Sequence, residues 1–157
     1  MKSRNLRKLL CLVVFFTLTG CSSPGPMQTS LGPINTPVFD SIALATAKDG
    51  TSEVKFKTQN AMLYKNGDLS YFVTSVFFIT ENGVYVASWD TQSYQYNLIV
   101  RIPVENIKRV YYKTYVRDYL PDLDLLVIET IENENIGFYI GGSSAVKSIL
   151  DEMIPKS

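Results

Sequence analysis

The chain has 157 residues and a formal net charge of zero, with 46% hydrophobic and 19% charged residues. It contains no histidine, which excludes nucleophilic catalysis through a Ser-His or Cys-His pair. It also has no phosphate-binding loop, dinucleotide-binding glycine pattern or G-x-S-x-G sequence, so these common enzyme signatures are missing.

The first 20 residues have the pattern of a cleavable secretory signal. Four basic residues and no acidic residue precede the apolar run 9–18, namely Lys2, Arg4, Arg7 and Lys8. This run is too short to cross a bilayer as a helix, which takes about 20 apolar residues. The pattern therefore predicts a signal peptide over residues 1–20 rather than a membrane-spanning anchor.

The end of this segment, Leu18-Thr19-Gly20-Cys21, resembles the lipobox of bacterial lipoproteins. The resemblance implies cleavage before Cys21, a diacylglyceryl group on its thiol, and a further acyl chain such as palmitate on the new amine. Ser22 follows, and by the same resemblance we expect a cell-envelope protein on the periplasmic side of the outer membrane if the bacterium has two membranes. The alternative is an ordinary signal peptide followed by an unmodified cysteine.

Cleavage changes the cysteine and charge content. Cys11 leaves with the signal, so Cys21 becomes the only cysteine and no internal disulfide can form. Four of the 15 basic residues also leave, so 11 basic residues remain against 15 acidic ones, a net charge of −4. We expect no nucleic-acid partner, because such binding depends on neutralising phosphates.

Residues 21–37 predict a flexible linker behind the lipidated cysteine. The stretch from Ser22 to Pro37 is uncharged and rich in proline, glycine and serine. Fully extended, it would hold a domain up to about 50 Å from the membrane. The remainder, 38–157, predicts a single β-rich domain, and residues 38–48 at its start fit a short helix or a first strand equally well.

Strand patterns dominate the middle of the chain. Runs rich in β-branched and aromatic residues are separated by turn sequences, among them Lys65-Asn66-Gly67-Asp68 and Glu81-Asn82-Gly83. Asn-Gly between two such runs is a strong hairpin signal, because both residues tolerate positive φ. The predicted strands are 54–57 continuing through 61–64, then 71–80, 84–89, 97–102, 107–116, 123–131 and 136–140.

The C-terminus predicts an amphipathic helix. Its apolar residues recur at helical spacing and lie on one face: Val146, Ile149, Leu150, Met153 and Ile154. Ser143 or Ser144 is the expected N-cap, and Pro155 is the expected stop. Such a helix must bury its apolar face against the open end or one face of the sheet.

Seven strands followed by one helix resemble the pleckstrin-homology-like fold, and 71–153 is similar to its GRAM-type branch. The hairpin 77–85 precedes an Ile-Pro segment, 102–107, and Val110 opens the next strand. The resemblance implies an α+β fold: a partly open antiparallel barrel of about seven strands, capped by one helix. A small closed barrel of the lipocalin type is the alternative.

One predicted strand carries a candidate binding face. Its odd positions are Ile107, Arg109, Tyr111, Lys113, Tyr115 and Arg117. Its even positions are Lys108, Val110, Tyr112, Thr114 and Val116. We expect this side of the strand to pack inward through Val110, Tyr112 and Val116. The predicted face is the outward set Arg109, Tyr111, Lys113, Tyr115 and Arg117, which interleaves cations with aromatic rings. Tyr94, Tyr96 and Tyr119 are candidates to extend it.

Other polar groups have simpler structural interpretations. Asp118, Asp122 and Asp124 form the densest carboxylate group. Asp122 and Asp124 would lie on the same side of a strand and are a candidate hard-cation site, but the simpler interpretation is a polar turn between strands. The tip 132–135 fits a hairpin turn. Gly141-Gly142 before Ser143 fits a turn into the helix, although free amides at a helix start also hold phosphate. We expect no metal ion, no cofactor and no catalytic residue.

These patterns favour a membrane-anchored, non-enzymatic module that binds or assembles other proteins of the cell envelope. The first alternative is a lipid- or glycan-binding module that uses the basic and tyrosine strand face. The second is an enzyme that works through carboxylates alone.

Overall fold

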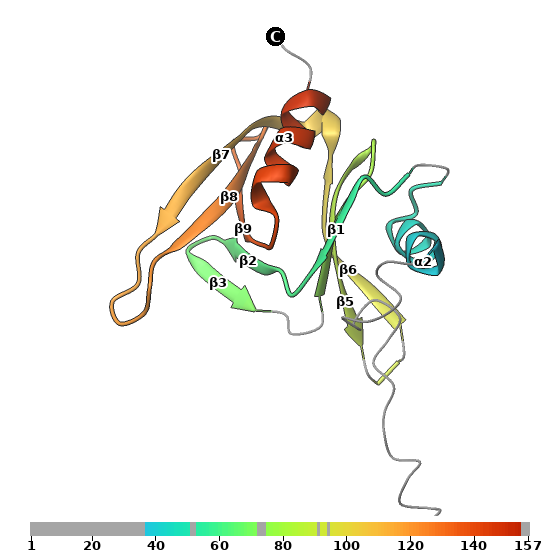
Figure 1. Cartoon of the computed structure of the whole chain (residues 1–157), viewed down its shortest axis with the longest axis horizontal. Coiled ribbons are helices and arrows are strands. Elements are labelled where there is room, and N and C mark those ends of the chain that lie inside the picture. The colour runs from blue at the N-terminus through green and yellow to red at the C-terminus, as the bar shows by residue number, and fades with distance from the viewer. Residues whose placement is uncertain (1–36, 51–52, 72–74, 91, 94, 155–157) are drawn as a thin grey trace, which may run out of the picture.

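The computed structural model describes residues 37–50, 53–71, 75–90, 92–93 and 95–154. Strands predominate in this part of the chain, and a helix lies at each end of it (Figure 1). The first half contains α2 (Pro37–Ala47), β1 (Phe56–Gln59), β2 (Met62–Lys65), β3 (Asp68–Tyr71), β4 (Ser75–Ile79) and β5 (Gly83–Asp90). The second half contains β6 (Gln95–Pro103), the 3-10 helix η2 (Val104–Asn106), β7 (Ile107–Tyr115), β8 (Leu123–Thr130), β9 (Asn135–Tyr139) and α3 (Ser143–Met153).

The strands form two antiparallel sheets. The first sheet has the order β1-β4-β5-β6, and the second sheet has the order β3-β2-β9-β8-β7. The fold is therefore mainly β with a C-terminal helix, as the sequence predicts, and its open arrangement agrees with a pleckstrin-homology-like fold. The alternative of a closed barrel is wrong, because the strands do not join into one continuous sheet.

The described residues form nine strands where about seven were predicted, because one hairpin is divided between the sheets. β1 pairs with β4 in the first sheet, and β2 pairs with β3 in the second. The predicted run 54–64 thus becomes β1 and β2, separated at Asn60, which has a φ of 61°. Counting each arm of this hairpin as one strand restores the predicted number.

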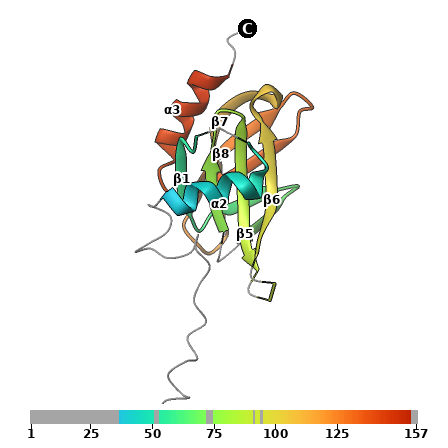
Figure 2. The same ribbon diagram turned by 90° about the vertical axis from the view of Figure 1, so that its right-hand side faces the viewer.

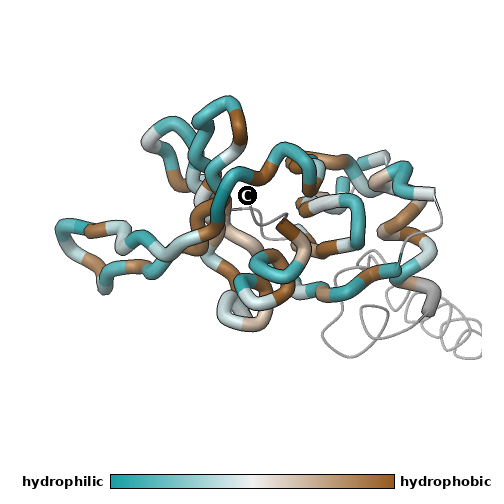
Figure 3. The backbone as a smooth tube through the Cα atoms, turned by 90° about the horizontal axis from the view of Figure 1, so that it is seen from above, coloured by the Kyte–Doolittle hydropathy of each residue, from teal (hydrophilic) through white to brown (hydrophobic). Residues whose placement is uncertain are grey.

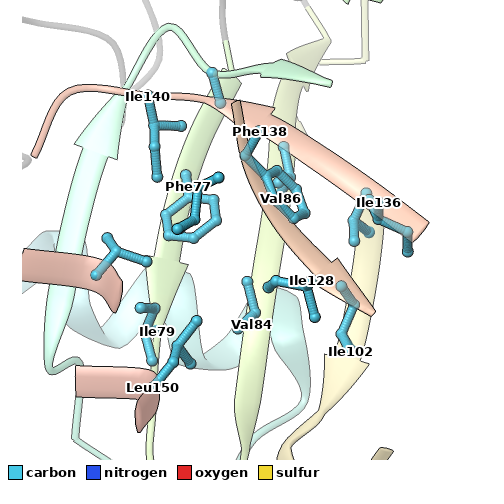
Figure 4. Close-up of a cluster of buried hydrophobic side chains, with 14 of the residues drawn as sticks. Phe77, Ile79, Val84, Val86, Ile102, Ile128, Ile136, Phe138, Ile140 and Leu150 are labelled. Atoms are coloured by element: carbon cyan, nitrogen blue, oxygen red, sulfur yellow. The ribbon is translucent and has the colours of Figure 1, made fainter. Parts of the chain in front are cut away.

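The main core lies between the two sheets (Figure 4). Phe77, Ile79 and Val84 of the first sheet meet Ile128 and Phe138 of the second, and each is fully buried. The rings of Phe77 and Phe138 pack edge to face, with centroids 5.3 Å apart.

Helix α3 covers the space between the two sheets (Figure 1). Val146 and Leu150 are fully buried in the main core, which confirms the predicted apolar face. The predicted serine cap is wrong: Gly142, with a φ of 75°, is the N-cap, and no side chain caps the helix. A Cβ at Gly142 would lie 2.9 Å from the ring of Phe56, so glycine fits both the backbone angle and the space.

Helix α2 crosses the outer face of the first sheet, which settles the ambiguity of residues 38–48 in favour of a helix (Figure 2). Phe39, Ala43 and Ala47 recur every four residues and are fully buried against Val76 and Phe78. The small alanines let the helix axis approach the sheet closely. An ion pair between Asp40 and Lys57, at 2.6 Å, adds a polar contact at the edge.

Both predicted Asn-Gly hairpins are present, but their turns differ. Asn66 and Gly67 have φ values of 55° and 92°, so both turn residues have the positive φ that an Asn-Gly hairpin predicts. Asn82 and Gly83 do not have positive φ, and Gly83 already belongs to β5. Glycine is needed there for space, since a Cβ would lie 2.6 Å from the carbonyl oxygen of Ile102.

Candidate functional site

Cys21, the predicted lipid attachment site, lies outside the described residues, as do Ser22 and Pro24 of the predicted linker. Within the described part of the chain, no helix is both long and apolar enough to span a membrane.

Strand β7 carries the predicted binding face except Arg117, which follows the end of the strand at Tyr115, and the strand has one irregularity at its start. The pairing with β8 shifts register between Ile107 and Arg109, so Ile107 is turned into the main core rather than outward. From Arg109 onward the alternation is regular, and Val110 is buried as predicted. The predicted outward position of Ile107 is therefore wrong, because a bulge displaces it by one position.

The prediction of inward packing at Tyr112 and Val116 is also wrong. Tyr112 is 45% exposed and Val116 is 72% exposed. Val116 follows Tyr115, the last paired residue of β7, and Tyr112 lies on this edge strand opposite Leu126, which is buried in the main core. This hairpin projects at the left of the molecule and mixes hydrophobic and hydrophilic residues (Figures 1 and 3).

The outer face of the second sheet carries a second apolar cluster, which we call the tyrosine face. Leu123, Leu125 and Val127 of β8 are buried in it. Partly buried side chains pack around them, namely Met62, Tyr64, Leu69, Tyr111 and Tyr115. The structure therefore brings Tyr111 and Tyr115 together, half-buried on the outer side of the sheet and apart from the main core.

Ring contacts and hydrogen bonds order the tyrosine face. The rings of Tyr64 and Tyr115 are 5.1 Å apart. The Tyr111 hydroxyl donates to Asn135 at 3.0 Å, and the Arg109 guanidinium lies 4.9 Å from the Tyr111 ring centroid. The sequence did not indicate that Tyr64 of β2 belongs to the tyrosine face, because only the strand order places β2 in the same sheet as β7.

Two cations at the start of β7 share one carboxylate. Glu129 accepts from Lys108 Nζ at 2.8 Å and from Arg109 Nε at 2.5 Å. The Lys108 and Arg109 hydrogen bonds hold the pKa of Glu129 below its ordinary value. Two positive charges against one negative charge leave this group with a net charge of about +1 at pH 7.

Lys113 and Arg117 differ in their surroundings. Lys113 is exposed, and within the described part of the chain no ion pair or hydrogen bond engages its side chain. Arg117 donates from its guanidinium to the carbonyl oxygen of Pro121, so it closes the turn between β7 and β8. Lys113 is thus the available cation of the predicted face.

The acidic cluster near this turn is structural. Asp122 accepts from the Arg117 backbone amide at 3.1 Å, and Asp124 accepts from the Thr114 hydroxyl at 2.9 Å. Among the described residues no group of three or more cysteine and carboxylate side chains is arranged to hold a metal ion. Tyr119, at the same turn, is 97% exposed.

Tyr96, a candidate to extend the face, does not do so. Tyr96 packs against the cluster beneath α2, with its ring 4.7 Å from that of Trp89, and so belongs to the other sheet. Tyr94 lies outside the described residues.

Sequence reasoning missed a polar network at the end of α2. The carboxylate of Asp49 is buried and accepts hydrogen bonds from Thr80 and Asn82. Burial raises the pKa of Tyr85, and the Asp49 carboxylate beside its hydroxyl raises it further. An open pocket of about 430 Å³ adjoins the network and includes Arg101. Through these hydrogen bonds Asp49, two residues after the end of α2, links this helix to the β4–β5 hairpin.

Comparison with models of known protein families gives no match, and comparison with curated proteins gives no significant similarity.

Proposed function

We propose that this chain is a lipid-anchored module of the bacterial cell envelope that binds another protein and is not an enzyme. The observation that carries the proposal is the tyrosine face, which no described helix covers, together with the exposed Lys113 beside it. Tyrosine presents a large apolar ring and a polar hydroxyl, a combination enriched where proteins bind one another.

The anchor is proposed from the sequence at Leu18-Thr19-Gly20-Cys21. A lipid chain on Cys21 would confine the domain near the membrane, while residues 21–37 would let it reach a partner. Confinement raises the effective concentration of the two proteins, so a contact of moderate affinity suffices.

Replacing Cys21 by serine tests the anchor. Serine has no thiol to receive the diacylglyceryl group, so incorporation of labelled palmitate should be lost and the precursor should stay uncleaved. Retention of lipid and of a normal mature mass in this variant would contradict the anchor.

Photocrosslinking in cells tests the binding surface. A photoreactive residue at Lys113 should form an adduct with an envelope protein, whereas the same residue at Lys55, an exposed lysine beside the first sheet, should not. Adducts to lipid or glycan alone at Lys113 would favour the alternative ligand class, and equal adducts at both positions would contradict a specific surface.

A further inference from the structure

Strand β7 ends the second sheet, and no other described strand pairs with its far edge. An unpaired edge presents free backbone amide and carbonyl groups that can pair with another extended chain. On its inner side, α3 approaches β7 where Ile107 and Val110 enter the core. Beyond Val110 the strand is exposed at Tyr112, Lys113 and Thr114, so this part of the edge is accessible.

The charge of this edge opposes pairing with a second copy of the same strand. β7 contains Lys108, Arg109 and Lys113 and no acidic residue. An antiparallel copy would bring like charges close together, which is destabilising. Glu129 balances only one of the cations, so an incoming strand with negative charge would be favoured.

The other three edges are poorer templates. β1 and β3 have four residues each, which gives few pairing positions. β6 is as long as β7 but ends at Pro103, which has no amide hydrogen to donate, and its only cation is Arg101.

We propose that β7 accepts an extended, acidic segment of the partner protein as an additional strand of the second sheet. This inference rests on the proposed protein-binding function and specifies its mode. Backbone hydrogen bonds along β7 would supply the pairing. Alternate side chains of the segment would lie on the outer side, where carboxylates meet Arg109 and Lys113 and apolar groups meet Tyr111 and Tyr115.

Amide hydrogen exchange of the purified, detergent-solubilised full-length chain tests this mode residue by residue. The probe is a ten-residue synthetic peptide whose odd positions are alternately glutamate and valine, with threonine at every even position, so that both kinds of side chain lie on one face of the strand. The control peptide has lysine in place of glutamate. The glutamate peptide should protect alternate amides of β7, those that point away from β8, while the lysine peptide should protect none. Protection of β6 instead, or equal protection by both peptides, would overturn the inference.

Charge variants sharpen the result. Lys113→Glu should weaken binding of the glutamate peptide about tenfold, and Lys55→Glu should leave it unchanged. Binding should weaken from 0.1 M to 1 M salt, as the Debye length falls from about 10 Å to about 3 Å. Equal affinity of the Lys113→Glu variant and the unaltered chain would contradict the acidic partner.

The outcomes separate this inference from the proposed function. A protein adduct at Lys113 in cells without alternate amide protection by the peptide would overturn strand addition and leave a protein-binding tyrosine face. Absence of any protein adduct at Lys113 would overturn the proposed function itself, and strand addition with it.

Discussion

On the outer side of the first sheet, α2 brings Phe39, Ala43 and Ala47 down onto the strands and closes the face. On the outer side of the second sheet, the covering side chains come from the sheet itself, and Tyr64, Tyr111 and Tyr115 remain half-exposed. The outer face of the first sheet is therefore covered by the chain's own helix. The outer face of the second sheet stays partly exposed, and another molecule can pack on it.

The sequence of the strands records this difference. Residues 76–79 of β4 and 84–87 of β5 are apolar at every position and are buried on both sides. β7 instead alternates cations with tyrosines on its outer side. Continuous apolar strands need cover on both faces, while alternating strands can leave one face in water.

Removing the anchor of the covered face should have the largest effect. Phe39→Ala should lower the free energy of unfolding by about 3–5 kcal/mol, because the buried ring leaves a cavity between α2 and the sheet. Chemical denaturation of the variant measures this loss. Ala45→Ser, at an exposed position of the same helix, should cost only about 0.5 kcal/mol. Equal midpoints for the two variants would mean that α2 does not hold the first sheet.

A matched deletion on the second face should cost less. Leu125 is 1% exposed, yet its cover consists of surface side chains that can settle into the space left behind. Leu125→Ala should therefore cost about 2 kcal/mol, near the lower limit for buried leucine. A loss as large as that of Phe39→Ala would show that the tyrosine face is as rigid as the helix-covered one.

The ion pairs of Glu129 with Lys108 and Arg109 should make the free energy of unfolding depend on pH. Its pKa is lowered by Lys108 and Arg109, so the stabilisation is present above the ordinary carboxyl pKa of about 4.3 and is lost as the pH falls through the folded-state pKa. Unfolding curves of the unaltered chain and of Glu129→Gln should differ at pH 7 and converge in acid. A difference independent of pH would mean that charge is not the cause.

The smallest effect on stability is expected at Lys113. Lys113→Glu should change the free energy of unfolding by less than about 0.5 kcal/mol, because the side chain is exposed. The same variant should lose capture of the partner in cells. Loss of both folding and capture would remove the distinction between a structural and a binding role.

Much of the fold could be predicted from the sequence, because periodicity reports local structure directly. The helical spacing from Val146 to Ile154 identified α3, and the Asn66-Gly67 turn identified a hairpin. α2 could not be separated from a strand by its own pattern, since its buried residues include only small alanines beside Phe39. The doubly apolar β4 and β5 were the available signal that a covering element was needed.

The candidate site was less predictable. Alternation correctly joined Tyr111 to Tyr115, but a single bulge moved Ile107 to the other side, and no local pattern announces a bulge. Tyr112 lies on an edge strand and Val116 follows the last paired residue of that strand, and alternation along the sequence reports neither position. The contact of Tyr64 with Tyr115 depends on strand order, which is a property of the whole sheet.

The position of α2 at the entry of the chain into the fold has a mechanical consequence. Among the described elements, α2 comes before every strand, so tension applied from the N-terminal side loads α2 before the sheets. Its contacts through Phe39, Ala43 and Ala47 can open one turn at a time, whereas the paired strands of a sheet must yield together. A pull on the N-terminus would then peel α2 from the first sheet and bare Val76 and Phe78, while the tyrosine face, on the other sheet, stayed intact.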